Sequence, residues 1–247
     1  MMRPKFLVAI AGALVIGLPP SLGLPNSAYT QLSAVEISQP PPPPNAPPPN
    51  GTRPGGGLEP ENPACSALND DLQALIPIAN PVLTTTAYPT ILFYVPFGAE
   101  EVDYGEFSLL LWPNEEMRLY RTRFLLPESP GVVSVTVPEI PTNALAEGQI
   151  YRWYFQLYCA EGEDDTQPDL TLHGAIQRVA STPERTQQIQ AGSPDIWYDA
   201  LADVANGLQA SPQDNQLRTQ WQSLLALIEA EAVEDAAFVG PVLSLEE

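Results

Sequence analysis

The sequence predicts a mainly β protein: an antiparallel seven-stranded β-sandwich of immunoglobulin- or fibronectin-like architecture, followed by a C-terminal helical hairpin. Three observations predict this class. Short runs rich in β-branched and aromatic residues follow one another, residues such as Pro, Gly and Asn separate them, and two apolar stripes with helical spacing come last. The predicted strands are 82–86, 90–96, 104–112, 117–126, 131–137, 149–159 and 170–179.

The clearest strand is 149–159. Bulky residues occupy every second position from Tyr151 to Cys159, which is the alternation of a half-buried strand. We therefore expect the Cys159 side chain to point into the core. The opposite face is a possible ligand-binding face, made of Arg152, Tyr154, Gln156 and Tyr158.

The strand at 117–126 has the same alternation. Tyr120 and Phe124 fall on one face, whereas Arg121 and Arg123 fall on the other. Because charged side chains stay in contact with water, we expect the arginine face to be the more hydrated one.

Three helix starts are marked by a hydroxyl residue directly before a proline, since proline is tolerated at the first helical position. These pairs are Thr182-Pro183, Ser193-Pro194 and Ser211-Pro212. The last two precede apolar stripes that predict an antiparallel hairpin. The apolar side of the hairpin needs a surface to cover. That surface is either the sandwich, including its outward tyrosines, or a partner.

The amino-terminal segment is typical of a cleaved secretory signal peptide over 1–23. Arg3 and Lys5 precede an uncharged, mostly apolar run, and small residues follow around position 21. That run is too short to span a bilayer, and no comparable stretch follows, so we expect no transmembrane segment in the mature chain. The expected localisation is the periplasm or the extracellular space.

Composition then changes along the chain. Proline runs at 40–44 and 47–49 predict a disordered proline-rich linker over 24–63. We expect a β-sandwich domain at 64–180, a helical C-terminal subdomain at 181–232 and an acidic flexible tail at 233–247.

Cys65 and Cys159 are the two cysteines of the chain. An exported protein meets an oxidising compartment, so we expect one disulfide between them. Closing a loop of roughly 100 residues stabilises a fold by about 4–5 kcal/mol in the chain-entropy model. The alternative, a pair of reactive thiols, lacks both a Cys-x-x-Cys spacing and a neighbouring base.

Charge excludes some functions. The formal net charge is −20, which excludes a basic nucleic-acid-binding surface and disfavours docking on anionic lipid. Such a charge keeps an exported protein soluble and monomeric, so we expect a monomer.

No constellation of residues dictates a reaction, so we predict no catalytic residue, no metal site, no cofactor and no enzyme activity. His173 is the one histidine, and no serine or cysteine nucleophile is aimed at it by any known motif. We expect it at the surface or at an interface. The acidic run 161–169 is either a solvated turn or a weak calcium site, since it does not follow an EF-hand pattern.

Five motifs in one order, from about Cys65 to Ile228, resemble the cyanobacterial domain-of-unknown-function 928 family. The motifs are Phe93-Tyr94-Val95-Pro96, Tyr120-Arg121 followed by 126–134, the run Tyr151 to Cys159, the run Gly174 to Val179 and the run Ile196 to Leu201. The resemblance implies an exported protein with no established activity, and it adds no chemistry.

The leading hypothesis is an exported, non-enzymatic binding or structural module of the cell envelope, whose partner is an unknown envelope protein or glycan. One alternative is a carbohydrate-binding module that uses Tyr154 and Tyr158, and another is an acid-dependent hydrolase. Exposed tyrosines would favour the first alternative. A pocket holding two carboxylates would favour the second.

Overall fold

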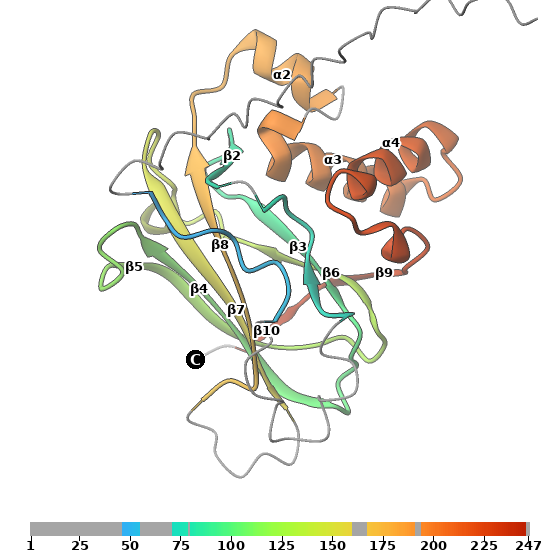
Figure 1. Ribbon diagram of the computed structural model, residues 1–247, viewed down its shortest axis with the longest axis horizontal. Helices are drawn as coiled ribbons and strands as arrows, with labels where there is room; N and C mark the ends of the chain where they lie inside the picture. The colour runs from blue at the N-terminus through green and yellow to red at the C-terminus, as the bar shows by residue number, and fades with distance from the viewer. Residues whose placement is uncertain (1–45, 55–70, 79, 160–166, 191–193, 246–247) are drawn as a thin grey trace, which may run out of the picture. The chain divides into compact units, whose positions relative to one another are not determined.

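The computed structural model describes residues 46–54, 71–78, 80–159, 167–190 and 194–245. The predicted signal peptide at 1–23 and Cys65 lie outside these residues. Over the described part, the chain forms a mainly β structure with two sheets and three α-helices (Figure 1). None of the helices described is long and apolar enough to cross a membrane.

The smaller sheet has four strands, in the order β1 (Gln73–Ala74), β3 (Thr90–Val95), β6 (Gly131–Thr136) and β9 (Phe238–Pro241). The larger sheet has six, in the order β10 (Leu243–Leu245), β5 (Arg118–Leu125), β4 (Val102–Leu111), β7 (Ile150–Cys159), β8 (Leu170–Arg178) and β2 (Val82–Thr84). Most neighbours are antiparallel, but β2 runs parallel to β8 and β9 runs parallel to β6.

All seven predicted strands are present, each within two residues of its predicted ends. The prediction of a strictly antiparallel, seven-stranded sandwich is wrong, because both sheets are mixed and contain three further strands, β1, β9 and β10. Those strands have two to four residues, too few to show a period of two. An immunoglobulin- or fibronectin-like architecture is not confirmed.

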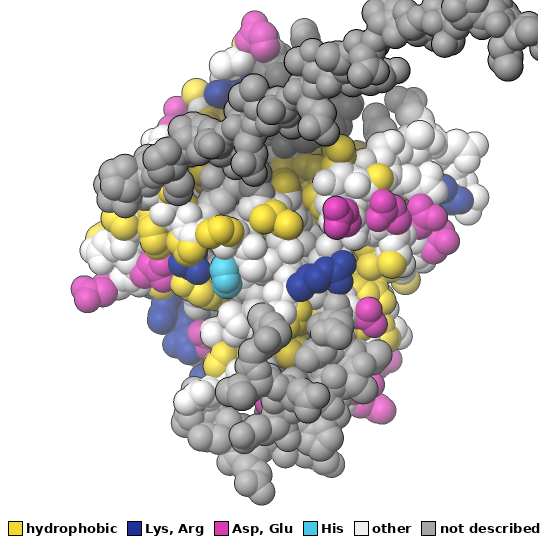
Figure 2. Space-filling model, in the orientation of Figure 1, with side chains coloured by type: hydrophobic (Ala, Val, Ile, Leu, Met, Phe, Trp, Pro, Cys, Tyr) yellow, Lys and Arg dark blue, Asp and Glu magenta, His cyan; other side chains and the backbone are white. Residues whose placement is uncertain are grey.

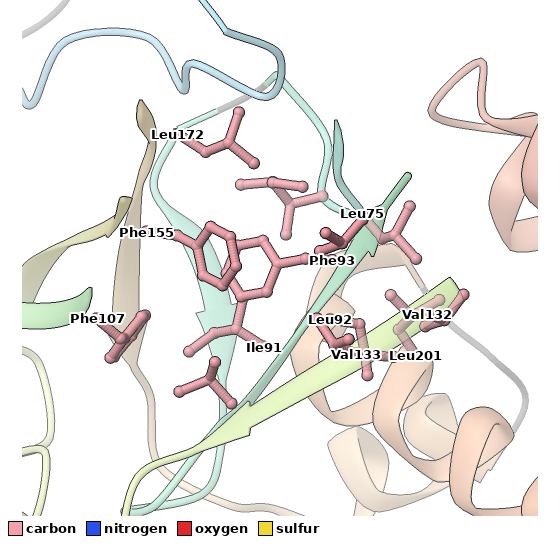
Figure 3. Packing of buried hydrophobic residues seen from close by; sticks show 14 of the residues in the cluster. Leu75, Ile91, Leu92, Phe93, Phe107, Val132, Val133, Phe155, Leu172 and Leu201 are labelled. Carbon is pink, nitrogen blue, oxygen red and sulfur yellow. The ribbon is translucent and has the colours of Figure 1, made fainter. Parts of the chain in front are cut away.

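The core lies between the two sheets. The Phe93 ring of β3 stacks on the Phe155 ring of β7 with centroids 4.1 Å apart, and the Trp153 ring meets Phe93 edge-on at 5.5 Å. Figure 3 shows Phe93 and Phe155 facing each other between the strands. Such aromatic pairs add about 0.5–1.5 kcal/mol beyond the burial of their area.

The alternation predicted for β7 is confirmed. Its inward side chains, from Tyr151 to Cys159, are all buried, and its outward side chains are partly exposed. Cys159 is 4% exposed at the end of this inward row. Because Cys65 is outside the described residues, its pairing with Cys159 stays a prediction.

The helices are α2 (Pro183–Gln190), α3 (Trp197–Ala210) and α4 (Asn215–Ala226). The Thr182 hydroxyl accepts a hydrogen bond from the backbone N–H of Arg185, as the predicted cap requires. A 3₁₀ turn, η3 (Pro194–Ile196), precedes α3. The predicted start of the third helix at Ser211 is wrong. Asp214 caps α4 instead, since its carboxylate accepts two backbone N–H groups.

The helices pack on the four-stranded sheet. Leu92 of β3 and Val132 of β6 are buried and point toward Leu201 of α3 (Figure 3). The Trp221 ring of α4 lies 5.1 Å from the Phe238 ring of β9. The layers are therefore the α3–α4 hairpin, the four-stranded sheet and the six-stranded sheet, as Figure 1 shows. The outward side of β7 faces away from this hairpin.

Buried hydrogen bonds attach α3 to the strands. The Trp153 indole Nε1–H donates to the Tyr198 hydroxyl at 2.8 Å, and the Trp197 Nε1–H donates to the carbonyl of Leu75 at 2.8 Å. The Asp199 carboxylate accepts from the Thr85 backbone N–H at 2.9 Å. Burial raises the pKa of the Asp199 carboxyl, and hydrogen bonds from Thr85 and Thr84 oppose the increase.

Two segments, one on each side of the predicted domains, differ from the domain organisation predicted above. Residues 46–54, which fall in the predicted linker, contact the edge of β8: Gly51 and His173 exchange two backbone hydrogen bonds of 2.9 and 3.1 Å. Figure 1 shows this blue segment crossing the sheet. At the other end, β9 and β10 lie in the predicted acidic tail, 233–247, and join both sheets. That segment is structured because its short apolar runs pair with β6 and β5.

We predict that Tyr198→Phe lowers the free energy of unfolding by about 1–3 kcal/mol, because the Trp153 indole N–H stays buried without its acceptor. Denaturant titration followed by circular dichroism measures the change. Tyr120→Phe is the control, with an expected change within about 0.5 kcal/mol. Equal effects of the two substitutions would show that the buried hydrogen bond contributes nothing specific.

Candidate ligand-binding face

The outward side of the six-stranded sheet collects polar, charged and aromatic side chains from four strands. Strand register places Arg123, Glu106, Gln156 and Thr171 in one row across the sheet, and Arg121, Ser108, Tyr154 and His173 in the next. With Tyr104, Arg152 and Tyr158, these residues form what we call the outer face. In Figure 2, basic side chains gather on the β4–β5 side, whereas acidic side chains gather beside α4 and β9.

Glu106 lies at the centre of the outer face and is only 6% exposed. Its carboxylate pairs with the Arg121 guanidinium and lies 3.7 Å from Nε of Arg123. The Ser108 hydroxyl donates to the other carboxylate oxygen at 3.4 Å. One shielded carboxylate thus holds two arginines of β5 in place.

Aromatic rings extend this arrangement. The Tyr104 and Tyr158 rings stack with centroids 4.3 Å apart and planes inclined by 14°. The Arg123 guanidinium lies over Tyr104, 5.0 Å from the ring centroid. Partial burial raises the pKa of the Tyr158 hydroxyl, with Glu106 as the second cause. The result is a stack of guanidinium, ring and ring across three strands.

A second cluster surrounds Arg152 and Tyr154. The Tyr154 hydroxyl donates to Glu115 at 2.8 Å, and an Arg152 nitrogen lies 3.4 Å from the other Glu115 oxygen. The Arg152 guanidinium lies 5.1 Å from the centroid of the Tyr154 ring and 5.9 Å from that of Trp112. Burial, then the hydrogen bond to Glu115, raises the pKa of Tyr154 to about 12. Tyr154 is therefore a neutral donor at physiological pH.

His173 borders this cluster and is half-buried. Its Nδ1 lies 3.3 Å from the Gly51 backbone N and 3.4 Å from an Arg152 nitrogen. Burial, followed by the positive charge of Arg152, lowers the pKa of the imidazole, and Glu115 partly opposes this. The histidine meets the 46–54 segment, consistent with the expectation of a surface or interface position.

The four residues predicted as a ligand-binding face, Arg152, Tyr154, Gln156 and Tyr158, do lie on one side of β7. Sequence reasoning missed their neighbours Tyr104, Glu106 and Glu115. Alternation in 117–126 indicated that Arg121 and Arg123 point outward, but it contained no sign of which strand lies beside them.

The predicted calcium-binding run is mostly outside the described residues, which include only its end from 167. Asp169 uses its carboxylate to accept the Cys159 backbone N–H at 2.8 Å. Within the described ranges, no group of three or more His, Cys, Asp or Glu side chains is arranged to hold a metal ion.

Two pockets bear on the hydrolase alternative. One, of about 630 Å³, lies between β2 and α2 and is lined by Glu184 and Asp195; the other, of about 540 Å³, lies between α4 and β9 and is lined by Glu234 and Asp235. Hydrogen bonds at the start of α2 lower the pKa of Glu184. A general acid requires a raised pKa, so this carboxylate does not favour acid catalysis.

The model of one protein family, Domain of Unknown Function (DUF928), matches residues 49–238. The chain belongs to the DUF928 family. The match starts in the 46–54 segment and ends at the first residue of β9. The DUF928 region therefore includes the three α-helices and every strand of the six-stranded sheet except β10. No curated protein matches the chain.

We predict that stability falls as the pH drops below about 6.5, because a lowered histidine pKa means that the unfolded chain binds the proton more tightly than the folded one. His173→Gln should flatten the pH dependence of the free energy of unfolding between pH 5 and 7. Parallel denaturant titrations of both proteins measure it. The same slope in both would contradict the lowered pKa.

Proposed function

We propose that this chain is an exported, non-enzymatic module of the cell envelope that binds carbohydrate on its outer face. One observation supports this most strongly. The α3–α4 hairpin covers the four-stranded sheet, so none of the described helices packs on the partly exposed tyrosines of β4 and β7. Partly exposed aromatic rings that are held rigidly beside hydrogen-bonding side chains suit the apolar faces and hydroxyl groups of sugars.

Tyr158 is the residue best placed to stack on a sugar ring. One face of its ring packs on Tyr104. Asp169, directly before β8, uses its carboxylate to accept the Cys159 backbone N–H. Among the described residues, no other ring or guanidinium packs on Tyr158. Its second ring face is therefore the one we assign to a sugar.

Gln156 supplies polar contacts in this proposal, and Tyr154 positions Arg152. Tyr154 lies four residues before Tyr158, about 13 Å away along the strand. Its ring is covered by Arg152 and its hydroxyl is engaged by Glu115, so it serves to position Arg152 rather than to stack. Gln156, between the two tyrosines, carries an amide that both donates and accepts hydrogen bonds.

The export part of the proposal is supported by the sequence alone. The predicted signal peptide at 1–23 favours an extracytoplasmic location, and the disulfide expected between Cys65 and Cys159 is compatible with such an oxidising compartment. The non-enzymatic part is supported by the surroundings of His173, whose contacts within the described ranges are Gly51, Arg152 and Tyr154 rather than a nucleophile.

We predict that the purified chain binds at least one polymer in a panel of soluble polysaccharides built from hexose, N-acetylhexosamine or uronate. Tyr158→Ala should weaken that binding roughly tenfold, because covering one ring face is worth about 1–2 kcal/mol. Affinity electrophoresis and titration calorimetry measure it.

Tyr88→Ala is the matched control, since Tyr88 is a partly buried tyrosine in the loop before β3, away from the outer face. It should leave the affinity unchanged. Two results would each overturn the proposal: no binding to any polysaccharide, or equal losses in the Tyr158 and Tyr88 variants with both proteins folded.

A further inference from the structure

We propose that the outer face selects an acidic polysaccharide, and that Arg123 binds the carboxylate of a uronate unit next to the sugar on Tyr158. This inference rests on the proposed function and specifies its ligand.

Arginines are concentrated on this side of the sheet. The chain has 10 lysines and arginines against 30 acids, yet Arg118, Arg121, Arg123 and Arg152 all lie on the outward side of β5 and β7. Glu106 and Glu115 pair with them, and the exposed Asp103 and Glu116 lie near them in sequence. These four arginines balance the four acids, so this face carries no net negative charge although the chain as a whole is strongly acidic.

The carboxylate of Glu106 does not saturate Arg123. Arg121 forms the close ion pair with Glu106, whereas the nearest Arg123 nitrogen is 3.7 Å from it, which is beyond hydrogen-bond distance. The Arg123 side chain remains 46% exposed, and its guanidinium carbon lies over the Tyr104 ring, 5.0 Å from the centroid. Such a guanidinium is oriented in advance and keeps N–H donors for a further carboxylate, which it binds through two parallel hydrogen bonds.

The order of the groups favours a chain of sugars. Arg123 on β5, Tyr104 on β4 and Tyr158 on β7 form one stack that spans two strand spacings, about 10 Å. The proposed anion-binding group is at one end of the stack, and the Tyr158 ring face that we assign to a sugar is at the other. A polymer that crosses the strands therefore meets the Tyr158 ring and then the Arg123 guanidinium. A ligand that contacts both needs a pyranose face for the ring and a carboxylate for the guanidinium.

Charge alone does not select this ligand. The net charge of −20 repels any polyanion at a distance, and screening at physiological salt confines charge effects to about 8 Å. Affinity must then come from contacts on the outer face itself. An acidic polypeptide offers carboxylates without sugar rings, so it is the competing ligand that the experiment includes.

The experiment compares polygalacturonate with fully methyl-esterified polygalacturonate, which keeps the sugar backbone and lacks the charge, and with polyglutamate. Titration calorimetry with the full chain at physiological salt gives each affinity. We expect polygalacturonate to bind at least tenfold more tightly than its ester or polyglutamate. Arg123→Gln should reduce polygalacturonate binding to the level of the ester and leave ester binding unchanged.

Arg185→Gln is the control, because Arg185 is an arginine of α2 whose guanidinium donates to the Ala180 carbonyl. It should leave all affinities as they are. Equal binding of the ester and the acid would overturn the acidic-ligand inference and leave carbohydrate binding intact. Two results would overturn both the acidic-ligand inference and the proposed carbohydrate binding. The first is binding of polyglutamate alone. The second is binding of none of these three polymers and of no polysaccharide in the panel.

Discussion

The indole N–H of Trp153 determines on which side of the sheets the helices lie. The ring points into the core, where it meets Phe93 edge-on and lies against Gly174, at which a Cβ atom would come within 2.4 Å of the ring. A donor buried this deeply needs an acceptor, and Tyr198 at the start of α3 supplies it. That hydrogen bond holds α3 on the side of β7 that faces the core, and the hairpin that α3 begins covers the four-stranded sheet. The opposite side of β7 is consequently left to polar and aromatic side chains.

On that opposite side, each arginine cluster combines an aromatic ring with a carboxylate. Arg123 lies on Tyr104 beside Glu106, and Arg152 lies on Tyr154 beside Glu115. Long guanidinium side chains lose much rotamer freedom on binding a ligand, and prior fixation lowers that loss. The fixed guanidinium groups therefore support the binding role that we propose for the outer face.

Local patterns predicted the features that depend on neighbours along the chain. The inward row of β7 and the arginine side of β5 follow directly from alternation. The start of α4 did not, because Ser211 and Asp214 are both good caps and only the folded turn shows that Asp214 receives two N–H groups. The pairing of Glu106 with Arg121 depends on the register of β4 against β5, which no local pattern specifies.

Oxidative footprinting of the tyrosines, read by mass spectrometry with and without oligogalacturonate, tests the central claim most directly. The account predicts that Tyr104 and Tyr158 are labelled in the free protein and protected by the sugar, while Tyr151 and Tyr198 remain unlabelled in both. Labelling of Tyr198 to the same extent as Tyr158, or protection by the sugar confined to the helices, would contradict it.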